Sequence, residues 1–412
     1  MPKSKRVIIY LYNRLFDPLI QSNFWLYIRS YLDDLANPIQ FHLITYEDPR
    51  FPLNEEQKSK VAQWQQQGLN WTPLTWHAGT GLANKFKDLF SGHFAVAKLR
   101  TKGYNHVVSL GSVAGTFAYV YAQTLGIRTF LYQYEPHSEY AIDNGMWAGD
   151  SLQYKLSHFL ERRSAEYASV IASGTRFMQE RLENDWKVKA KFFRIPTVAN
   201  EDKFTFNPVD RAAVRQELGL KPDQWVLYYP GKFGDLYYRE ELAWMFKWLN
   251  EECPDLHLLI VTPHTDEEVH TLFAQAEVPQ HTYSVCHSDY QDIHRYAFAC
   301  DFAIISVPPG PSKCFISNIK VGEYLCAGLP FLITRGVSED FEYAEQRGVG
   351  VVVDDFVKDE AKKAWPEIKA YLEMDAEQRR QHCREIGLGY RGFSTLNPIF
   401  KAAIDTLTRR NT

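Results

Sequence analysis

Short apolar runs, rich in β-branched and aromatic residues, alternate with longer segments of helical periodicity along the whole chain. This alternation is typical of a parallel sheet whose strands are joined by helices. We expect six strands in the first half, and most of them are continuous apolar runs, as strands buried on both faces are. Their expected ranges are 6–12, 39–46, 106–110, 128–134, 169–173 and 191–195.

A helix is predicted between the first two of these strands. Its apolar residues recur at three- and four-residue spacing, and Ser22 stands where a capping residue is expected. The residues of this stripe are Phe24, Tyr27, Ile28, Tyr31, Leu32 and Leu35. We therefore expect a helix that docks on the sheet.

The second half of the chain repeats the alternation. Segment 195–208 carries proline, asparagine and charged residues without periodicity, so we place the linker between two domains there. Five further strands are expected at 225–229, 256–261, 302–306, 331–334 and 349–353. With 412 residues, the chain is long enough for two α/β domains of about 200 residues each.

Composition and charge narrow the classes of function. The chain is 45% hydrophobic with a net charge of −4, so it is globular and shows no basic face for nucleic acid. No stretch approaches the roughly 20 apolar residues that span a bilayer, and Asn13 and Arg14 interrupt the first apolar run. The six cysteines lack CxxC spacing, which favours reduced thiols and a cytoplasmic protein. A peripheral contact with the inner face of a membrane stays open.

The segment SNIKVGEYLCAGLPFLIT, at 317–334, predicts a helix that begins at the carboxyl edge of the second sheet. Ser317 or Asn318 can cap it, and Gly328 can end it in a left-handed conformation. Lys320 and the free N–H groups of the first turn suit a diphosphate, and Glu323 suits the vicinal hydroxyls of a ribose. The alternative is an exposed Lys320–Glu323 pair that contributes only a few tenths of a kcal/mol, roughly, to helix stability.

The same segment resembles the donor-site helix of glycosyltransferase family 4, whose members usually read Pro-x-Lys-x-x-Glu-Tyr-Leu-Ala-x-Gly-x-Pro. In that family the final Glu grips the donor ribose, so the resemblance assigns this role to Glu323. Phe315 departs from the family pattern, because many members carry an acidic residue eight positions before this Glu. The matching residues are Lys320, Glu323, Tyr324, Leu325, Gly328 and Pro330.

Weaker similarity extends to other segments of the second half. YYPGKFGDLYY, at 228–238, resembles the opening strand and turn of the family's donor domain, where a glycine and a basic residue meet the phosphates. This implies phosphate contacts from Gly231, Lys232 and Arg239. Ser317 or Lys313 is a candidate to replace the missing acid; the alternative is that its function is absent. Tyr290 and His264 flank second-half strands, where a nucleotide base can stack; the alternative for both is a structural role.

Candidate acceptor and reaction-centre residues lie in the first half, in YQYEPHSEY at 132–140. This segment follows an expected strand, so we predict a loop at the carboxyl edge of the first sheet. Glu135 and His137 are candidate catalytic groups that orient the acceptor hydroxyl or take its proton. Glu139, together with Asn13 in the loop after the first strand, is a candidate acceptor contact. A structural role for this histidine is the alternative.

Other enzyme classes fit the sequence less well. GLGYRG, at 387–392, satisfies the dinucleotide-binding pattern, but it follows a helix instead of a strand. No Asp-x-Asp occurs, which disfavours a transferase that clamps the diphosphate through a divalent metal. We therefore predict metal independence and no cofactor beyond the nucleotide-sugar substrate. A non-catalytic subunit that binds a nucleotide sugar or glycan is the rival interpretation, motivated by Phe315.

The resemblance implies a GT-B architecture, with two facing Rossmann-like, doubly wound domains. We expect an acceptor domain at 1–198, a donor domain at 199–392 and a C-terminal helix at 393–412 that crosses back to the first domain. By the same resemblance the enzyme is a retaining glycosyltransferase, acting on a glycan, lipid-linked or small-molecule acceptor in bacterial cell-surface polysaccharide or glycoconjugate synthesis. The sequence leaves open the donor base and sugar, the acceptor, the linkage and the oligomeric state.

Overall fold

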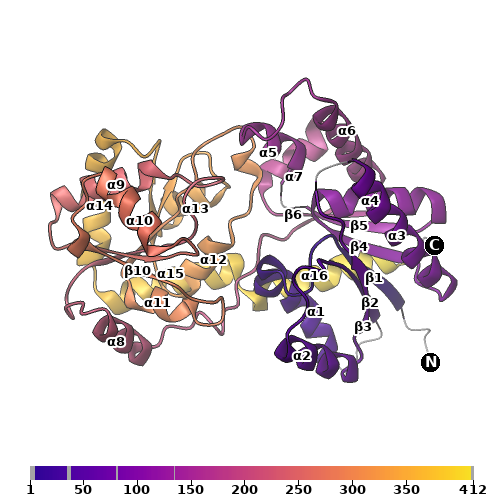
Figure 1. Cartoon of the computed structure of the whole chain (residues 1–412), viewed down its shortest axis with the longest axis horizontal. Helices are drawn as coiled ribbons and strands as arrows, with labels where there is room; N and C mark the ends of the chain where they lie inside the picture. Colours follow the sequence, from indigo (N-terminus) through magenta and orange to yellow (C-terminus); the bar gives the residue numbers. More distant parts are fainter. Residues whose placement is uncertain (1–4, 35–38, 80–81, 134, 410–412) are drawn as a thin grey trace. The chain divides into compact units, whose positions relative to one another are not determined.

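The computed structural model describes residues 5–34, 39–79, 82–133 and 135–409, which form two compact units (Figure 1). Unit 1 comprises Met1–Pro196 and Leu396–Thr412, and unit 2 comprises Thr197–Thr395. The chain therefore divides after 196 and 395, where the sequence placed its boundaries after 198 and 392. Each unit holds one parallel sheet covered by helices, so the predicted doubly wound α/β class is confirmed.

The sheet of unit 1 has seven parallel strands in the order β3-β2-β1-β4-β5-β6-β7. Six of these strands were predicted, and β3 was missed because it is a half-exposed edge strand that contains Pro73. The strands are β1 (Lys5–Leu11), β2 (Ile39–Glu47), β3 (Asn70–Thr75), β4 (His106–Leu110), β5 (Arg128–Gln133), β6 (Val170–Ser173) and β7 (Lys191–Arg194).

The helices of unit 1 include the one predicted after the first strand. Its expected cap is wrong: Ser22 lies inside a buried π-helical turn, and the α-helix begins only at Trp25. Leu35, at the end of the predicted stripe, lies outside the described residues. The helical elements are η1 (Ile20–Phe24), α1 (Trp25–Leu32), α2 (Glu55–Gln66), α3 (Leu82–Thr101), α4 (Gly111–Leu125), α5 (His137–Asp143), α6 (Leu152–Tyr167) and α7 (Arg176–Asn184).

The last helix, α16 (Phe393–Thr408), packs on unit 1 from Leu396 onward. Phe400 stacks on Tyr27 with ring centroids 4.4 Å apart and meets Phe24 edge-on at 5.7 Å. Lys5 and Asp405 form an ion pair at 3.0 Å. The C-terminal segment of the chain therefore returns to the unit in which the chain began, and it buries its apolar stripe there.

The sheet of unit 2 has six parallel strands in the order β10-β9-β8-β11-β12-β13. Five strands were predicted, and the short edge strand β10 was missed. The strands are β8 (Val226–Pro230), β9 (His257–Val261), β10 (Tyr283–Cys286), β11 (Phe302–Ile304), β12 (Phe331–Thr334) and β13 (Gly350–Val353). The helical elements are α8 (Pro208–Glu217), α9 (Glu240–Glu252), α10 (Asp266–Gln275), η2 (Gln280–Thr282), α11 (Ile293–Ala299), η3 (Lys313–Phe315), α12 (Ile319–Cys326), α13 (Asp340–Arg347), α14 (Lys358–Glu373) and α15 (Ala376–Arg391).

Each sheet has one point at which the strand order reverses, called here the switch point. In unit 1 this point lies between β1 and β4, and in unit 2 between β8 and β11. Open α/β sheets bind their ligands outside the carboxyl ends of the strands at such a point. The loops after β1, β4, β8 and β11 are therefore where ligand-binding residues are expected.

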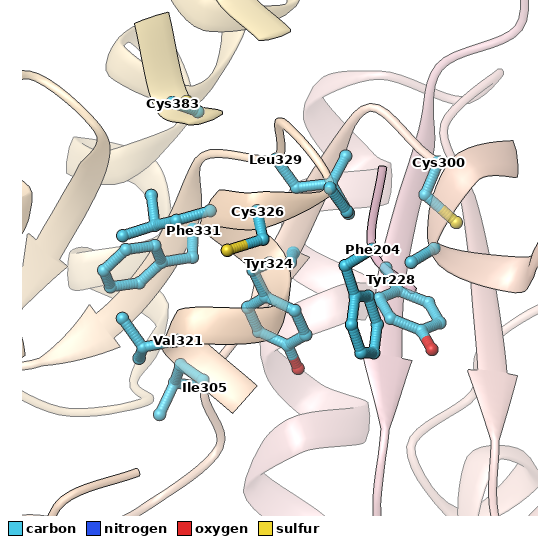
Figure 2. Close-up of a cluster of buried hydrophobic side chains, with 14 of the residues drawn as sticks. Phe204, Tyr228, Cys300, Ile305, Val321, Tyr324, Cys326, Leu329, Phe331 and Cys383 are labelled. Carbon is cyan, nitrogen blue, oxygen red and sulfur yellow. The ribbon is translucent and has the colours of Figure 1, made fainter. Parts of the chain in front are cut away.

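Helix α12 is anchored in unit 2 by one apolar face (Figure 2). Val321, Tyr324 and Cys326 are buried in a cluster with Phe204 and Tyr228. The Tyr324 hydroxyl donates a hydrogen bond to the carbonyl oxygen of Ile304 on β11 at 3.1 Å. This packing fixes the rotation of the helix about its axis and so fixes where Lys320 and Glu323 lie.

Candidate functional site

The two ends of α12 form as the sequence predicts. The Asn318 side chain accepts a hydrogen bond from the backbone N–H of Lys320 at 3.0 Å and so caps the helix. Beyond the helix, Gly328 has a φ of +78°, and a Cβ there would lie 2.7 Å from the Cβ of Arg380. Both the conformation and the space therefore require glycine.

Ser317 lies just before α12 and takes part in a buried polar network. Its hydroxyl oxygen accepts hydrogen bonds from the backbone N–H of Thr197 at 2.9 Å and from Nη1 of Arg391 at 2.8 Å. Arg391 also pairs with Asp340, and both side chains are fully buried. The Ser317 hydroxyl thus helps to join the start of unit 2 to α15, and its role in donor binding stays a prediction.

Glu323 lies one turn into α12 and is only 6% exposed. Its Oε1 atom has no hydrogen-bond partner among the described residues. Burial raises the pKa of this carboxyl to about 7, against the opposing effects of the Tyr290 hydroxyl, Lys203 and Lys320. An exposed Lys320–Glu323 pair, the alternative left by the sequence, is therefore wrong. A buried carboxylate with spare acceptor capacity at the switch point is a candidate ligand contact.

Lys203 is a second charged group beside Glu323, and the sequence did not single it out. Its ammonium lies 3.8 Å from the centre of the Tyr290 ring and donates a hydrogen bond to the carbonyl oxygen of Tyr290. Burial lowers its pKa to about 8, although Glu323 and Asp292 favour the charged form. Because Lys203 belongs to the aperiodic segment 195–208, its charge was attributed to a linker.

Lys320 and Gly231 are brought together at the switch point. The Lys320 ammonium lies 4.0 Å from the Tyr237 ring centre and 5.6 Å from that of Tyr229. A Cβ on Gly231 would be only 2.6 Å from this ammonium. The missing side chain thus lets the cation lie directly over the backbone that follows β8. A cation beside a glycine backbone and a helix N-terminus can hold a diphosphate without a metal.

The remaining donor-side candidates lie on the surface or in loops. Lys232 and Arg239 are exposed, and the Arg239 side chain lies 3.5 Å from that of Glu240. His264 accepts a hydrogen bond from the backbone N–H of Phe233 at 3.2 Å, so it holds the loop after β8 in place. Phosphate contacts by Lys232 and Arg239 stay predictions.

In unit 1, the segment 132–140 differs from the expected loop. From His137 onward it is helix α5, and residue 134 lies outside the described residues. Burial and the nearby Lys85 lower the pKa of His137, which favours a neutral imidazole able to accept a proton. Its ring meets Trp147 edge-on at 5.5 Å. The carbonyl oxygen of Glu135 accepts a hydrogen bond from the Ser112 hydroxyl at 3.0 Å.

The two expected acceptor contacts already have partners within unit 1. Glu139 forms a bidentate ion pair with Arg181, and His158 lies 3.7 Å from the same carboxylate. The Asn13 amide donates a hydrogen bond to Asp17 at 3.3 Å. Their roles as acceptor ligands stay predictions.

A polar cluster that the sequence did not reveal lies at the carboxyl edge of the sheet in unit 1. The fully buried Asp88 accepts hydrogen bonds from the Tyr12 hydroxyl and from Nδ1 of His77, the latter at 2.6 Å. Lys85 lies 3.0 Å from the Tyr12 hydroxyl. His77 follows β3, which was not predicted, so nothing in the sequence indicated that it stands at a strand end beside Tyr12.

The described residues form neither a metal-binding cluster nor a membrane-spanning helix. No group of three or more His, Cys, Asp or Glu side chains among them is arranged to hold a metal ion. Within the same part of the chain, no helix is long and apolar enough to cross a membrane.

Comparison with known proteins places the fold. No protein-family model and no curated protein sequence matches the chain. Sucrose-phosphate synthase from Thermosynechococcus elongatus is similar in structure, with a TM-score of 0.73 at 14% identity over 98% of this chain and 99% of that one. HepE from Anabaena, in complex with UDP, is similar with a TM-score of 0.69 at 12% identity, over 98% of this chain and 100% of that one. A glycosyltransferase from Rickettsia africae is similar with a TM-score of 0.68 at 11% identity, over the full length of both chains. The predicted GT-B fold is thereby confirmed.

Proposed function

We propose that this protein is a glycosyltransferase that binds a nucleotide sugar in unit 2 and transfers the sugar to an acceptor held by unit 1. The observation that carries the proposal is the environment of Glu323. This buried carboxylate has one oxygen without a hydrogen-bond partner among the described residues, feels the charges of Lys203 and Lys320, and lies at the point where ligands bind in this fold. A buried acceptor without a hydrogen-bond partner lowers the stability of the free protein, and a ligand with hydroxyl groups would donate the missing hydrogen bond.

The proposed donor contacts divide between ribose and diphosphate. The two hydroxyls of the ribose donate hydrogen bonds to Glu323. Lys320, the backbone at Gly231 and the start of α12 neutralise the diphosphate, and Lys232 and Arg239 add charge from the surface. Tyr290 lies beside Glu323 and is placed to meet the base. Because these cations do the work of a metal ion, the reaction requires no divalent cation and no cofactor.

Two further observations support a nucleotide-sugar donor. HepE, which shares the fold, has also been crystallised with UDP-glucose. Two of the residues that match the family 4 motif, Lys320 and Glu323, lie on α12, which follows β11, and β11 is one of the two strands at the switch point of unit 2. By that resemblance the transfer retains the anomeric configuration, with the leaving phosphate assisting attack from the same face.

The acceptor side of the proposal rests on unit 1. Burial lowers the pKa of His137, which favours a neutral ring that can accept a hydrogen bond from an acceptor hydroxyl, and Glu135 lies two positions before it in the chain. Glu139, paired with Arg181, and Asn13, paired with Asp17, contribute to acceptor binding by fixing the positions of these neighbours. The acceptor is a glycan, a lipid-linked sugar or a small molecule of cell-surface glycoconjugate synthesis, and the reaction takes place in the cytoplasm or at the inner face of the membrane.

The test is a screen of nucleotide sugars for slow release of nucleoside diphosphate, with and without EDTA. UDP-glucose is the first probe, because a protein of this fold binds it. The proposal expects release with at least one donor, unaffected by EDTA and reduced by about tenfold or more in Glu323→Ala, which loses a charged hydrogen-bond acceptor. Release that needs Mn²⁺ or Mg²⁺ would contradict the phosphate site, and donor binding without any release would contradict the enzyme.

A non-catalytic binding subunit is the second candidate. It is favoured by Phe315, which ends the short helix η3 at the position where many family 4 members carry an acidic residue. The two candidates differ in turnover and not in binding. Tight binding of a nucleotide sugar that survives days of incubation intact would support the subunit.

A further inference from the structure

Helix α3 of unit 1 exposes three large aromatic side chains in one row. Phe86, Phe90 and Phe94 follow one another at four-residue intervals, so they share one face of the helix. They are 54%, 59% and 71% exposed, respectively. Leaving a side chain of this size in water costs about 1.5 to 3 kcal/mol relative to burying it, so three in a row need an explanation.

The opposite face of α3 is the one that packs on the sheet. Gly92 approaches so closely that a Cβ would collide with the hydroxyls of Tyr10, Tyr46 and Tyr121. Val96 on the same face is fully buried. The phenylalanine row is therefore a second apolar face on a surface helix whose core-facing side is already occupied, whereas such helices normally present polar residues outward.

Helix α6 adds a second exposed apolar row to the same helical layer. Leu152, Leu156 and Phe159 are exposed along its length. Helix α4 lies between α3 and α6 and contacts both, and its Tyr119 meets Tyr167 of α6 edge-on at 5.8 Å (Figure 1). The apolar surface thus belongs to two helices that flank a third.

The charge around the phenylalanine row is positive, although the chain as a whole carries −4. The one acidic residue of α3, Asp88, is buried and bonded to His77. Lys87 and Lys98 are exposed beside the row, and neither forms an ion pair with any residue that the structure describes. The exposed face of α3 therefore combines aromatic side chains with unpaired cations.

We propose that the phenylalanine face of α3 (Phe86, Phe90 and Phe94, with Lys87 and Lys98) binds the anionic lipid surface of a membrane. A helix that lies in the interface inserts its apolar face about 5 to 10 Å into the lipid headgroup region, while its lysines meet anionic headgroups. A second copy of this chain is a poorer occupant, because a twofold contact would bring the same lysines face to face. The inference rests on unit 1 alone and does not depend on sugar transfer.

The experiment is sedimentation of the full chain with phosphatidylcholine vesicles, with and without 30% phosphatidylglycerol, at about 0.05 and 0.5 M NaCl. The expected result is binding to the anionic vesicles that weakens with salt. The triple variant Phe86→Ser/Phe90→Ser/Phe94→Ser should bind about tenfold less or weaker still. A matched triple variant in unit 2, Val209→Ser/Val357→Ser/Met374→Ser, removes three exposed apolar side chains and should bind as the wild type does.

Two additional measurements keep the proposal falsifiable if the triple variant misfolds. Lys87→Glu/Lys98→Glu leaves the apolar row intact and should lower binding to anionic vesicles by about tenfold or more. UDP-glucose affinity without vesicles should be unchanged in every variant, which separates this proposal from the donor site. Wild-type protein that binds neither vesicle overturns the proposal. So does a phenylalanine variant that binds normally, or a wild-type dimer that the triple variant abolishes without any vesicle binding.

Discussion

Two buried glutamates, one in each unit, have the same raised pKa and different surroundings. Burial raises the pKa of both Glu161 and Glu323 to about 7. Glu161, on α6, accepts hydrogen bonds from the backbone N–H of Ser138 at 3.0 Å and from the hydroxyl of the same residue. Glu323, on α12, keeps one carboxylate oxygen without a hydrogen-bond partner among the described residues.

The difference separates a structural acid from a candidate binding acid. Both carboxylate oxygens of Glu161 accept hydrogen bonds from Ser138 in the first turn of α5. Glu323 is held at the sheet edge by the packing of α12, beside Lys203 and Lys320, and its hydrogen-bonding capacity is incomplete. A raised pKa alone therefore does not distinguish the two glutamates, whereas the raised pKa together with an oxygen that lacks a hydrogen-bond partner makes Glu323 the candidate for ligand binding.

The largest expected effect is on stability when the charge of Glu323 is removed. Its pKa in the folded protein lies above the unfolded value of about 4.5, so ionisation costs folding free energy as pH rises from there to about 7. Glu323→Gln should therefore be more stable than wild type by about 3 kcal/mol at pH 8 and equally stable at pH 4.5. Urea unfolding at the two pH values measures this. A variant that is less stable at pH 8 would mean that the Tyr290 hydroxyl and the two lysines stabilise the charged form by more than burial destabilises it.

A smaller effect, opposite in sign, is expected at Glu161. Replacement by alanine removes the carboxylate that accepts from two buried donors of Ser138, which costs about 1 to 3 kcal/mol. Unfolding is measured at pH 6, where the wild-type carboxyl is largely neutral. Glu166→Ala on the same helix removes only exposed ion pairs and should cost less than about 1 kcal/mol. A change in UDP-glucose affinity in Glu161→Ala would contradict the structural role.

The smallest expected effect concerns the glycine beside Lys320. Gly231→Ala places a methyl group 2.6 Å from the lysine ammonium, so the side chain must move away from the backbone after β8. UDP-glucose binding should weaken by roughly threefold to tenfold, in line with the loss of about 1 kcal/mol. Gly389→Ala, on α15 with no atom within 4 Å of the new methyl group, is the control and should bind normally. Equal affinities in both variants would remove Lys320 from the phosphate site.

The elements that could be predicted are those marked by a pattern within their own stretch of sequence. Buried strands such as β4 and β12 are continuous apolar runs, and α12 carries its cap at Asn318 and its terminating glycine at Gly328 within one segment. Edge strand β3 escaped prediction because it contains a proline and is half exposed, so neither an apolar run nor a clean alternation marks it. The π-helical turn at Ser22 likewise has no local signature in the apolar pattern.

The candidate site could be predicted only in part, because its charges come together through tertiary contacts. Glu323 and Lys320 share one helix and were found by motif. Lys203 lies near Glu323 but belongs to a segment without a periodic apolar pattern. Its contact with Tyr290 joins residues 87 positions apart in the sequence. The pairing of Asp88 with His77 depends on the missed strand β3. Burial, which distinguishes Glu323 from an exposed helix residue, is likewise a property of the fold.

The central claim is that Glu323 binds the donor through its ionised carboxylate. Calorimetry of UDP-glucose binding at pH 6 and pH 7.5, with wild type and Glu323→Gln, tests it most directly, because the diphosphate of a nucleotide sugar does not titrate in this range. With a pKa of about 7, the ionised fraction of Glu323 rises several-fold between these pH values, so wild-type affinity should rise by a similar factor. The variant should bind about tenfold more weakly at pH 7.5 and show no such rise. Equal affinity and equal pH dependence in the two proteins would contradict the account.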